Sequence, residues 1–359
     1  MSGAFSLERA GRWFLSSGIQ NPSGGVARFY LAESEKSKPV STEITGYTAS
    51  ALMYLYSVTG RDEYLDRARL TAKFLCEHAW DAGLRMFPYE HPSPSGESDH
   101  LGYFFDSGII VRGLLAVWRV TREQRLLDVA SVAAQSMLAA FRADDGYHPI
   151  LQLPGKSPLP RTGGWSRSPG CYQAKAALAW WDVAALTDDE AMRSAYLEMM
   201  EQALRTHEAF LPGEASRPRV MDRLHAYAYF LEALMPLLDR GECAEACAMG
   251  IGKASRLLRE IAPEFARSDV YAQVLRARVY ASDVIPLDVE AAREEAARLA
   301  EFQAASDDRR VEGSFWFGRR GGEFVRHANP VSTAFAIQAL GVWEAFQDGR
   351  TASFEAAVI

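Results

Sequence analysis

The feature that most constrains the fold is an internal repeat of helical hairpins. The stretch from Tyr103 to Ala130 holds a polar and aromatic entrance, an almost wholly apolar helix, a short charged turn and an amphipathic helix. Matching positions recur 62 residues earlier, where Leu52, Val58, Thr59, Leu65, Asp66 and Ala68 correspond to Leu114, Val120, Thr121, Leu127, Asp128 and Ala130. A looser third copy begins at Tyr172. Such periodicity predicts a repeat architecture in which each hairpin buries its apolar face against the next.

Extending the pattern predicts two kinds of helix in alternation. Six apolar helices start near Tyr47, Asp106, Tyr172, His225, Val270 and Asn329. Helices with one apolar stripe and one charged face are expected near 62–77, 123–141, 189–209, 242–260 and 289–305. The N-terminal helix, about 6–17, is expected to pack beside the last apolar helix, 331–346, and to close a ring. The predicted fold is therefore all-α, a six-hairpin (α/α)6 toroid forming a single domain over 1–359.

The ends of the apolar helices are expected to carry the polar chemistry. Ser, Asp and Asn at these starts suit helix N-caps, and Pro330 suits a first turn. Long connections are expected at 83–100, 144–170, 212–222 and 307–329, each leading into an apolar helix. In a toroid these loops and helix starts gather on one face, around the mouth of a central funnel. A functional site is predicted there.

Composition excludes several classes of protein. The net charge of −7 and the lack of a Lys/Arg cluster argue against a nucleic-acid partner. We expect no membrane span and no signal peptide, because no long uncharged apolar run occurs. Four cysteines form no disulfide framework and favour the cytoplasm, and Cys243 and Cys247 are interpreted as small buried residues rather than metal ligands. Without a P-loop, GxGxxG, HExxH or GxSxG motif, we predict no cofactor and no metal; the oligomeric state stays open.

Polar and aromatic residues at the predicted mouth suit a saccharide, because rings stack on sugar C–H faces and charged groups bind hydroxyls or carboxylates. Arginines in particular bind a uronate carboxylate bidentately. Epimerisation or elimination at a uronate C5 needs a base and an acid, roles that Tyr, His and Glu can fill. The candidate catalytic residues are Tyr172, His225, Tyr227, Asp106 and Glu43. The candidate substrate-binding residues are Tyr47, Tyr103, Trp165, Arg167, Arg223, Arg276, His327, Asn329 and Trp316.

The order of three phrases carries a resemblance to a known family. They are TGYTASALMYLYSVTGRDEYLDRA, YFFDSGIIVRGLLAVWRVT and, after the Tyr172 helix, DRLHAYAYFLEALM. Over roughly Thr42 to Leu238 the chain resembles the D-glucuronyl C5-epimerase C-terminal-like proteins of bacterial polysaccharide gene clusters. The resemblance implies an (α/α)6 fold and a sugar context, and no residue role is carried over from it.

Other functions remain open at this point. Glycoside hydrolysis needs two carboxylates flanking the bond, and Glu43, Asp106, Asp222 and Asp269 are candidates. Unsaturated glucuronyl hydrolases would give Asp106 an acid/base role, and N-acylglucosamine 2-epimerases would use His225 and His327 as a pair. The Gln20 to Gly25 and Phe315 to Leu340 stretches are similar to terpene cyclase repeats, yet the DxDD acid motif is missing. A non-catalytic saccharide-binding toroid is also possible, since a fold by itself gives no activity.

Overall fold

A computed structural model describes residues 5–91, 100–162, 164–211, 216–350 and 359. The protein is mostly helical, and its strands are short. Residues 92–99 and 212–215, which belong to two of the predicted long loops, lie outside the described residues. None of the helices in the described part of the chain combines the length and the hydropathy that a membrane span needs.

The chain divides into two compact units, which we describe separately. Unit 1 consists of Met1–Ser17, Phe29–Lys36 and Leu204–Ile359, and unit 2 consists of Gly18–Arg28 and Ser37–Ala203. The predicted single domain over 1–359 therefore stays a prediction. Helix α7 (Glu190–Phe210) contains the point at which the chain passes from unit 2 to unit 1.

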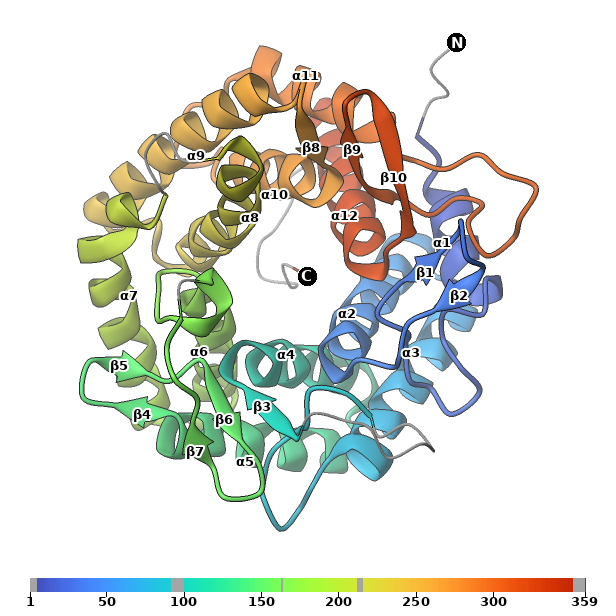
Figure 1. The fold of residues 1–359 in the computed structure, drawn as a ribbon. Coiled ribbons are helices and arrows are strands. Elements are labelled where there is room, and N and C mark those ends of the chain that lie inside the picture. Colours follow the sequence, from blue (N-terminus) through green and yellow to red (C-terminus); the bar gives the residue numbers. More distant parts are fainter. Residues whose placement is uncertain (1–4, 92–99, 163, 212–215, 351–358) are drawn as a thin grey trace. The chain divides into compact units, whose positions relative to one another are not determined.

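Unit 2 is built from hairpins in two layers (Figure 1). One layer holds the apolar helices α2 (Thr42–Thr59), α4 (Phe104–Thr121) and α6 (Gln173–Thr187), side by side. The other layer holds α3 (Asp62–Phe74), its π-helical end η1 (Leu75–Ala79) and α5 (Gln124–Ala140). Helix α3 packs on α2 and α4, and α5 packs on α4 and α6. The apolar helices are buried because partners cover them on more than one side, as their sequences predict.

Glycines allow the apolar helices of unit 2 to approach one another closely. A Cβ atom added at Gly108 would lie 2.4 Å from the carbonyl oxygen of Ala176, across the α4–α6 contact. A Cβ atom at Gly113 would lie 2.4 Å from the carbonyl oxygen of Gly46, across the α2–α4 contact. Because backbone atoms cannot move aside as a flexible side chain can, only glycine fits at these positions.

We expect Gly108→Ala to lower the free energy of unfolding by about 1–3 kcal/mol, because the new methyl group must push α4 and α6 apart. Denaturation in urea measures this loss. The matched control is Gly252→Ala, where a Cβ atom would meet nothing within 4 Å. In the interior of helix α9 this change is expected to stabilise by about 0.5–1 kcal/mol. Equal effects of the two substitutions would contradict the close packing.

Unit 1 repeats the same two-layer pattern. Its apolar helices are α8 (Arg217–Ala233), α10 (Ser268–Tyr280) and α12 (Pro330–Gln347), with α10 in contact with both others. Helix α9 (Gly241–Ile261) packs on α8 and α10, and α11 (Val289–Ala300) packs on α10 and α12. Helix α1 (Leu7–Ser16) contacts α12, which confirms the predicted place of the N-terminal helix beside the last apolar one.

Two expectations about helix starts need correction. Helix α8 begins at Arg217 rather than near Asp222, so Asp222 and Arg223 lie in its second turn. The predicted capping role holds for Asn329, whose Oδ1 accepts the N–H groups of Val331 and Ser332. It is wrong for Asp106, which is the third residue of α4, because the N-cap position belongs to Tyr103, an extended residue whose side chain makes no cap hydrogen bond.

Short strands lie in the connections between helices, inside and outside the predicted long loops, and the sequence analysis did not anticipate them. In unit 1, strands pair in the order β1 (Tyr30–Leu31), β10 (Glu323–Ala328), β9 (Trp316–Arg320) and β8 (Phe265–Arg267). In unit 2, β3 (Leu101–Tyr103) pairs with β6 (Ile150–Gln152), and β6 pairs with β7 (Ser157–Pro158). The remaining short elements are β2 (Lys36–Ser37), β4 (Arg142–Ala143), β5 (Gly146–Tyr147), η2 (Trp165–Arg167) and η3 (Met235–Leu237). Strands of two to six residues are too short for an alternating pattern to reveal them.

Candidate functional site

Two carboxyl groups meet in unit 2 at the starts of neighbouring apolar helices. Glu43 is the second residue of α2 and Asp106 is the third residue of α4. Burial raises the pKa of Glu43 from 4.5 to about 7, although the nearby Arg28 charge opposes the shift. Burial, and then the charge of Glu43, raise the pKa of Asp106 well above its ordinary value. We call Glu43 and Asp106 the acid pair.

One oxygen atom of the acid pair makes no hydrogen bond to the described part of the chain. Asp106 is 5% exposed, and its Oδ2 atom is buried without a hydrogen-bond partner in the described part of the chain. A bare carboxylate oxygen in such a place is costly, whereas a protonated carboxyl carries no charge there. Burial and the mutual repulsion of the two carboxyls therefore favour the protonated form, so that one carboxyl can donate a proton beside a group that can accept one.

A cation faces the acid pair from a loop that precedes α2. The guanidinium of Arg28 forms an ion pair with Glu90 and lies over the Tyr89 ring, 5.3 Å from its centroid. The Tyr89 ring in turn packs on Tyr103 with ring centroids 4.9 Å apart. The charge of Arg28 lowers the pKa of both acid-pair carboxyls, which places it near them. Its buried Nε atom has no hydrogen-bond partner in the described residues.

The sequence analysis identified Glu43, Asp106 and Tyr103 but missed Arg28, Tyr89 and Glu90. These three lie in irregular segments, where hydrophobic periodicity gives no signal about which side chain faces which helix. The sign available in the sequence is the aromatic run at 87–89, which gives no indication of a cation beside it.

The acid pair makes stability depend on pH in a defined direction. Because the pKa of Glu43 is higher in the folded chain than in the unfolded one, folding is favoured at low pH. This contribution is lost as pH rises from 4.5 through about 7. We expect Glu43→Gln, which is neutral at every pH, to be more stable relative to wild type at pH 8 than at pH 5. Urea unfolding at both pH values measures the difference, and Glu245→Gln on the exposed side of α9 is the control. If the free energies of unfolding of Glu43→Gln and wild type differed by the same amount at pH 5 and at pH 8, the result would contradict a raised pKa of Glu43.

Tyr172, at the start of α6, stands beside the acid pair. Its hydroxyl donates to the Ser168 carbonyl at 3.2 Å, and its ring packs on Trp165 with centroids 5.1 Å apart. Burial, and then the charges of Cys171 and Asp106, raise its pKa. Tyr172 is therefore a protonated phenol that can donate a proton but is a poor base. Arg167 follows Trp165 in the short helix η2, and Tyr47 is buried in α2.

His225 forms a separate cluster inside unit 1. Its Nδ1 atom lies 2.8 Å from Gln273 Oε1, and its Nε2 atom lies 2.9 Å from the Tyr229 hydroxyl. Burial lowers the pKa of His225 to about 4, against the opposing charge of Asp269, so the ring is neutral at pH 7. Gln273 and Tyr229, which the sequence analysis did not list, hold the ring at both nitrogens.

A buried ion-pair chain supports the His225 cluster. Arg267 donates to both oxygens of Asp269, at 2.9 and 2.6 Å, and to Asp222 at 2.9 Å. Burial alone would raise the pKa of Asp269, but the charges of Arg267 and then His225 lower it below its ordinary value. Asp269 therefore stays ionised 3.5 Å from His225 Nδ1. Of the carboxylates considered for hydrolysis, Asp222 and Asp269 are bound to this arginine.

Three other predicted residues of unit 1 make contacts within the protein. Arg276 is fully buried, forms an ion pair with Glu232 and donates to Gln338 Oε1 at 2.7 Å. Tyr227 lies with its hydroxyl 3.0 Å from His207 Nδ1. Arg223 donates to the Phe210 carbonyl oxygen at 2.7 Å and lies over the Phe210 ring. These contacts favour structural roles.

The last predicted residues lie around the sheet of unit 1. His327, in β10, stacks on Phe29 with ring centroids 4.9 Å apart. Trp316, in β9, is buried, and the Arg326 guanidinium lies 6.0 Å from its ring centroid. Asn329 is committed to capping α12. The structure thus brings Glu43, Asp106, Tyr103 and Tyr172 together in unit 2 and places His225 among other partners in unit 1.

Comparison with solved structures identifies the fold. A sugar epimerase from a ruminal bacterium has a TM-score of 0.71 at 10% identity, covering 92% of this chain and 97% of that one. Cellobiose 2-epimerase from Spirochaeta thermophila DSM 6192 has a TM-score of 0.72 at 14% identity, covering 95% of both chains. Bt3792, a glycoside hydrolase family 76 mannosidase from Bacteroides thetaiotaomicron VPI-5482, has a TM-score of 0.62 at 10% identity, covering 95% and 99%.

The fold class is therefore that of the (α/α)6 toroid enzymes, as the helical repeat predicts. No protein-family model matches the chain, and a search of curated proteins finds no match. The resemblance to D-glucuronyl C5-epimerase C-terminal-like proteins stays a prediction, since these similar structures belong to other sugar enzymes.

Proposed function

We propose that the protein is a carbohydrate-active enzyme that exchanges protons at C5 of a uronate in a saccharide, with Glu43 and Asp106 as base and acid. The observation that carries the proposal is the acid pair itself: two interacting carboxyls, one with a pKa of about 7, buried at two helix starts. Two neighbouring carboxyls whose pKa values are both raised above the ordinary carboxyl range can supply the base and the acid that proton transfer at carbon needs.

The chemistry balances with the groups present. Ionised Glu43 takes the C5 proton, and the electron pair of the broken C–H bond passes into the neighbouring uronate carboxylate. The Arg28 guanidinium stabilises the charge that develops there. Protonated Asp106 then returns a proton to C5. Return to the opposite face gives the C5 epimer, whereas expulsion of the C4 oxygen substituent, with that proton, gives elimination and a C4–C5 double bond.

Arg28 is better placed to bind a substrate carboxylate than Arg276, a predicted substrate-binding residue that lies in the core. Both arginines are ion-paired, Arg28 with Glu90 and Arg276 with Glu232, but the side chain of Arg28 is 35% exposed whereas that of Arg276 is 0% exposed. Because a guanidinium has five N–H donors, the partly exposed Arg28 can bind an incoming carboxylate beside Glu90.

Glycoside hydrolysis is the second candidate. It is favoured by the same acid pair, because a carboxyl held protonated at neutral pH is the general acid that a glycosidic oxygen requires. The mannosidase with this fold supports this alternative to the same extent that the epimerases support the first.

We also propose a single catalytic domain and a cytoplasmic location, the latter because all four cysteines are free and buried.

The test is proton NMR of uronate-containing oligosaccharides incubated with the protein in deuterium oxide. Loss of the C5 proton signal is expected, and the product spectrum separates epimerase from lyase. A new reducing end without exchange at C5 would replace the proposal with hydrolysis. Binding without exchange or cleavage would indicate a saccharide-binding protein.

A further inference from the structure

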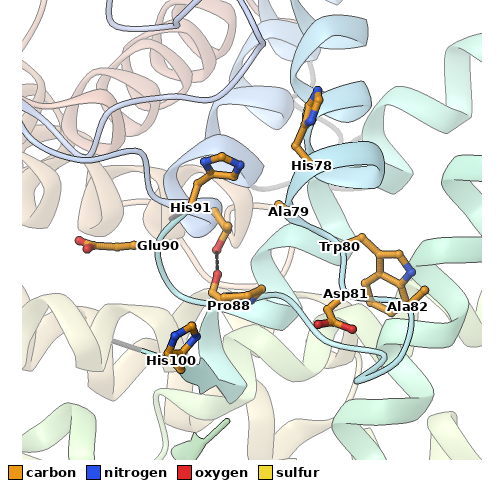
Figure 2. A pocket seen from close by; sticks show the side chains of 10 residues that line it. His78, Ala79, Trp80, Asp81, Ala82, Pro88, Glu90, His91 and His100 are labelled. Atoms are coloured by element: carbon orange, nitrogen blue, oxygen red, sulfur yellow. Dashed lines mark hydrogen bonds between the residues drawn. The ribbon is translucent and has the colours of Figure 1, made fainter. Parts of the chain in front are cut away.

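A polar hollow lies in unit 2, lined by neither carboxyl of the acid pair. It has a volume of about 410 Å³, within the range of roughly 300–1,000 Å³ found for small-molecule sites. Its walls come from the end of η1 and the turn after it, from the segment 88–91, and from Thr42 and His100 (Figure 2). We call it the histidine pocket, after His78, His91 and His100.

Three rings of the histidine pocket pack on neighbouring aromatic side chains. The Trp80 indole packs on Phe87 with centroids 4.9 Å apart. The His78 and His91 imidazoles pack on Phe74, at 5.8 and 5.1 Å. A wall that is already ordered loses little conformational freedom when a ligand binds, so it is suited to recognition.

The charge of the lining restricts the occupant. Among the residues that the structure describes, the lining contains the carboxylates of Asp81 and Glu90 and no lysine or arginine. Asp81 is fixed by the Leu84 N–H, which donates to its Oδ1 at 2.8 Å. An anion such as a uronate or a phosphate would meet the carboxylate of Asp81, and the Arg28 guanidinium beside the wall is already in an ion pair with Glu90. Nor is a metal ion favoured, since the described residues contain no group of three or more His, Cys, Asp or Glu that could hold one.

We propose that the histidine pocket binds an uncharged sugar ring. An indole offers a face for sugar C–H groups, while imidazoles and carboxylates exchange hydrogen bonds with hydroxyls. This combination of one aromatic surface and several convergent polar groups is typical of small-molecule sites.

The pocket also shares a wall with the acid pair. Thr42 lines the pocket and directly precedes Glu43, and its hydroxyl donates to the Pro88 carbonyl at 2.7 Å. Glu90 lines the pocket and forms the ion pair with Arg28. A saccharide with one uncharged unit in the histidine pocket and a uronate at Arg28 fits this arrangement. That extension rests on the proposed function, whereas binding of the uncharged sugar does not.

The experiment is titration of protein carrying ¹⁵N-labelled tryptophan with cellobiose, maltose, N-acetylglucosamine and, separately, glucuronate. Trp80→Phe assigns the Trp80 indole signal. We expect a saturable shift of this signal with at least one uncharged sugar, with a Kd of about 1 mM, and none with glucuronate. His78→Ala and His100→Ala are each expected to weaken the affinity about 3–10-fold, through one lost hydrogen bond. Trp118→Phe, outside the lining, is the matched control and should leave the titration unchanged.

No saturable shift with any of the uncharged sugars would overturn the proposal, as would a shift with glucuronate of equal affinity. Because the titration needs no turnover, it is repeated on Glu43→Gln. Binding that survives in this variant would show that the pocket acts independently of the acid pair, whereas saturable binding to wild type without C5 proton exchange would overturn the proposed function and leave the histidine pocket standing.

Discussion

Glu43→Gln is expected to lower kcat about 10²–10⁴-fold while the protein remains folded, which is the contribution typical of a positioned acid or base. Glutamine keeps the shape of the side chain and its hydrogen-bonding oxygen but cannot carry a proton to or from carbon. Asp106→Asn is expected to have an effect of similar size, since the two carboxyls act on one reaction. The measurement is the rate of C5 deuterium exchange on a uronate oligosaccharide at saturating substrate.

The pH dependence gives the sharper form of this prediction. With Glu43 as base, wild-type kcat/KM should fall as pH drops below about 7, the pKa of that carboxyl. The residual activity of Glu43→Gln should not show this fall in kcat/KM at low pH. Glu77→Gln, an exposed carboxyl of the same unit, should leave both rate and pH profile unchanged. Full activity of Glu43→Gln with the same fall at low pH would remove the acid pair from the mechanism.

Breaking the ion pair between Arg276 and Glu232 should be the most damaging change to stability. Arg276 is 0% exposed and Glu232 is 1% exposed, so removing either partner leaves a buried charge without its counter-ion. We expect Arg276→Met or Glu232→Gln alone to lower the free energy of unfolding by about 3–5 kcal/mol. The Arg276 guanidinium also lies 4.5 Å from the centroid of the Phe335 ring, a contact that methionine replaces with apolar packing.

The double variant Arg276→Met/Glu232→Met tests the cause. Replacing both charges with apolar groups of similar size should recover most of the loss, because no unpaired charge remains. The exposed pair of Arg256 and Glu260 on α9 is the control, and its removal should cost at most about 0.5 kcal/mol. Single variants that unfold no more easily than this control would contradict the prediction.

The same double variant separates two roles for Arg276. The sequence analysis considered it a uronate ligand, whereas its contacts favour a structural role. A folded double variant with wild-type KM for the uronate substrate would support the structural role. A KM raised about tenfold or more, corresponding to at least 1.4 kcal/mol of binding, would restore Arg276 to the substrate site.

The helical repeat was open to prediction because hydrophobic periodicity is a local property of the chain. Regular spacing between the Tyr103 stretch and its copies implied paired helices, and the unpaired helix at each end implied that α1 lies beside α12. The alternation of wholly apolar and half-polar helices could be predicted too. A helix buried on several sides has apolar residues all round each turn, whereas a helix buried on one side has them in a single stripe. The short strands in the connections have too few residues to show a periodic pattern of apolar side chains.

What each polar side chain does was settled only by tertiary structure. Arg28 and Arg276 are the same residue type, yet one is half-exposed beside the acid pair and the other is sealed into the core. Glu43 and Asp106 acquire their raised pKa values from burial and from one another, although 63 positions separate them in the chain. The sequence determines which chemical groups the protein has and the helices that carry them. Which groups meet, and with what charge, depends on long-range packing and local desolvation, which no stretch of sequence contains by itself.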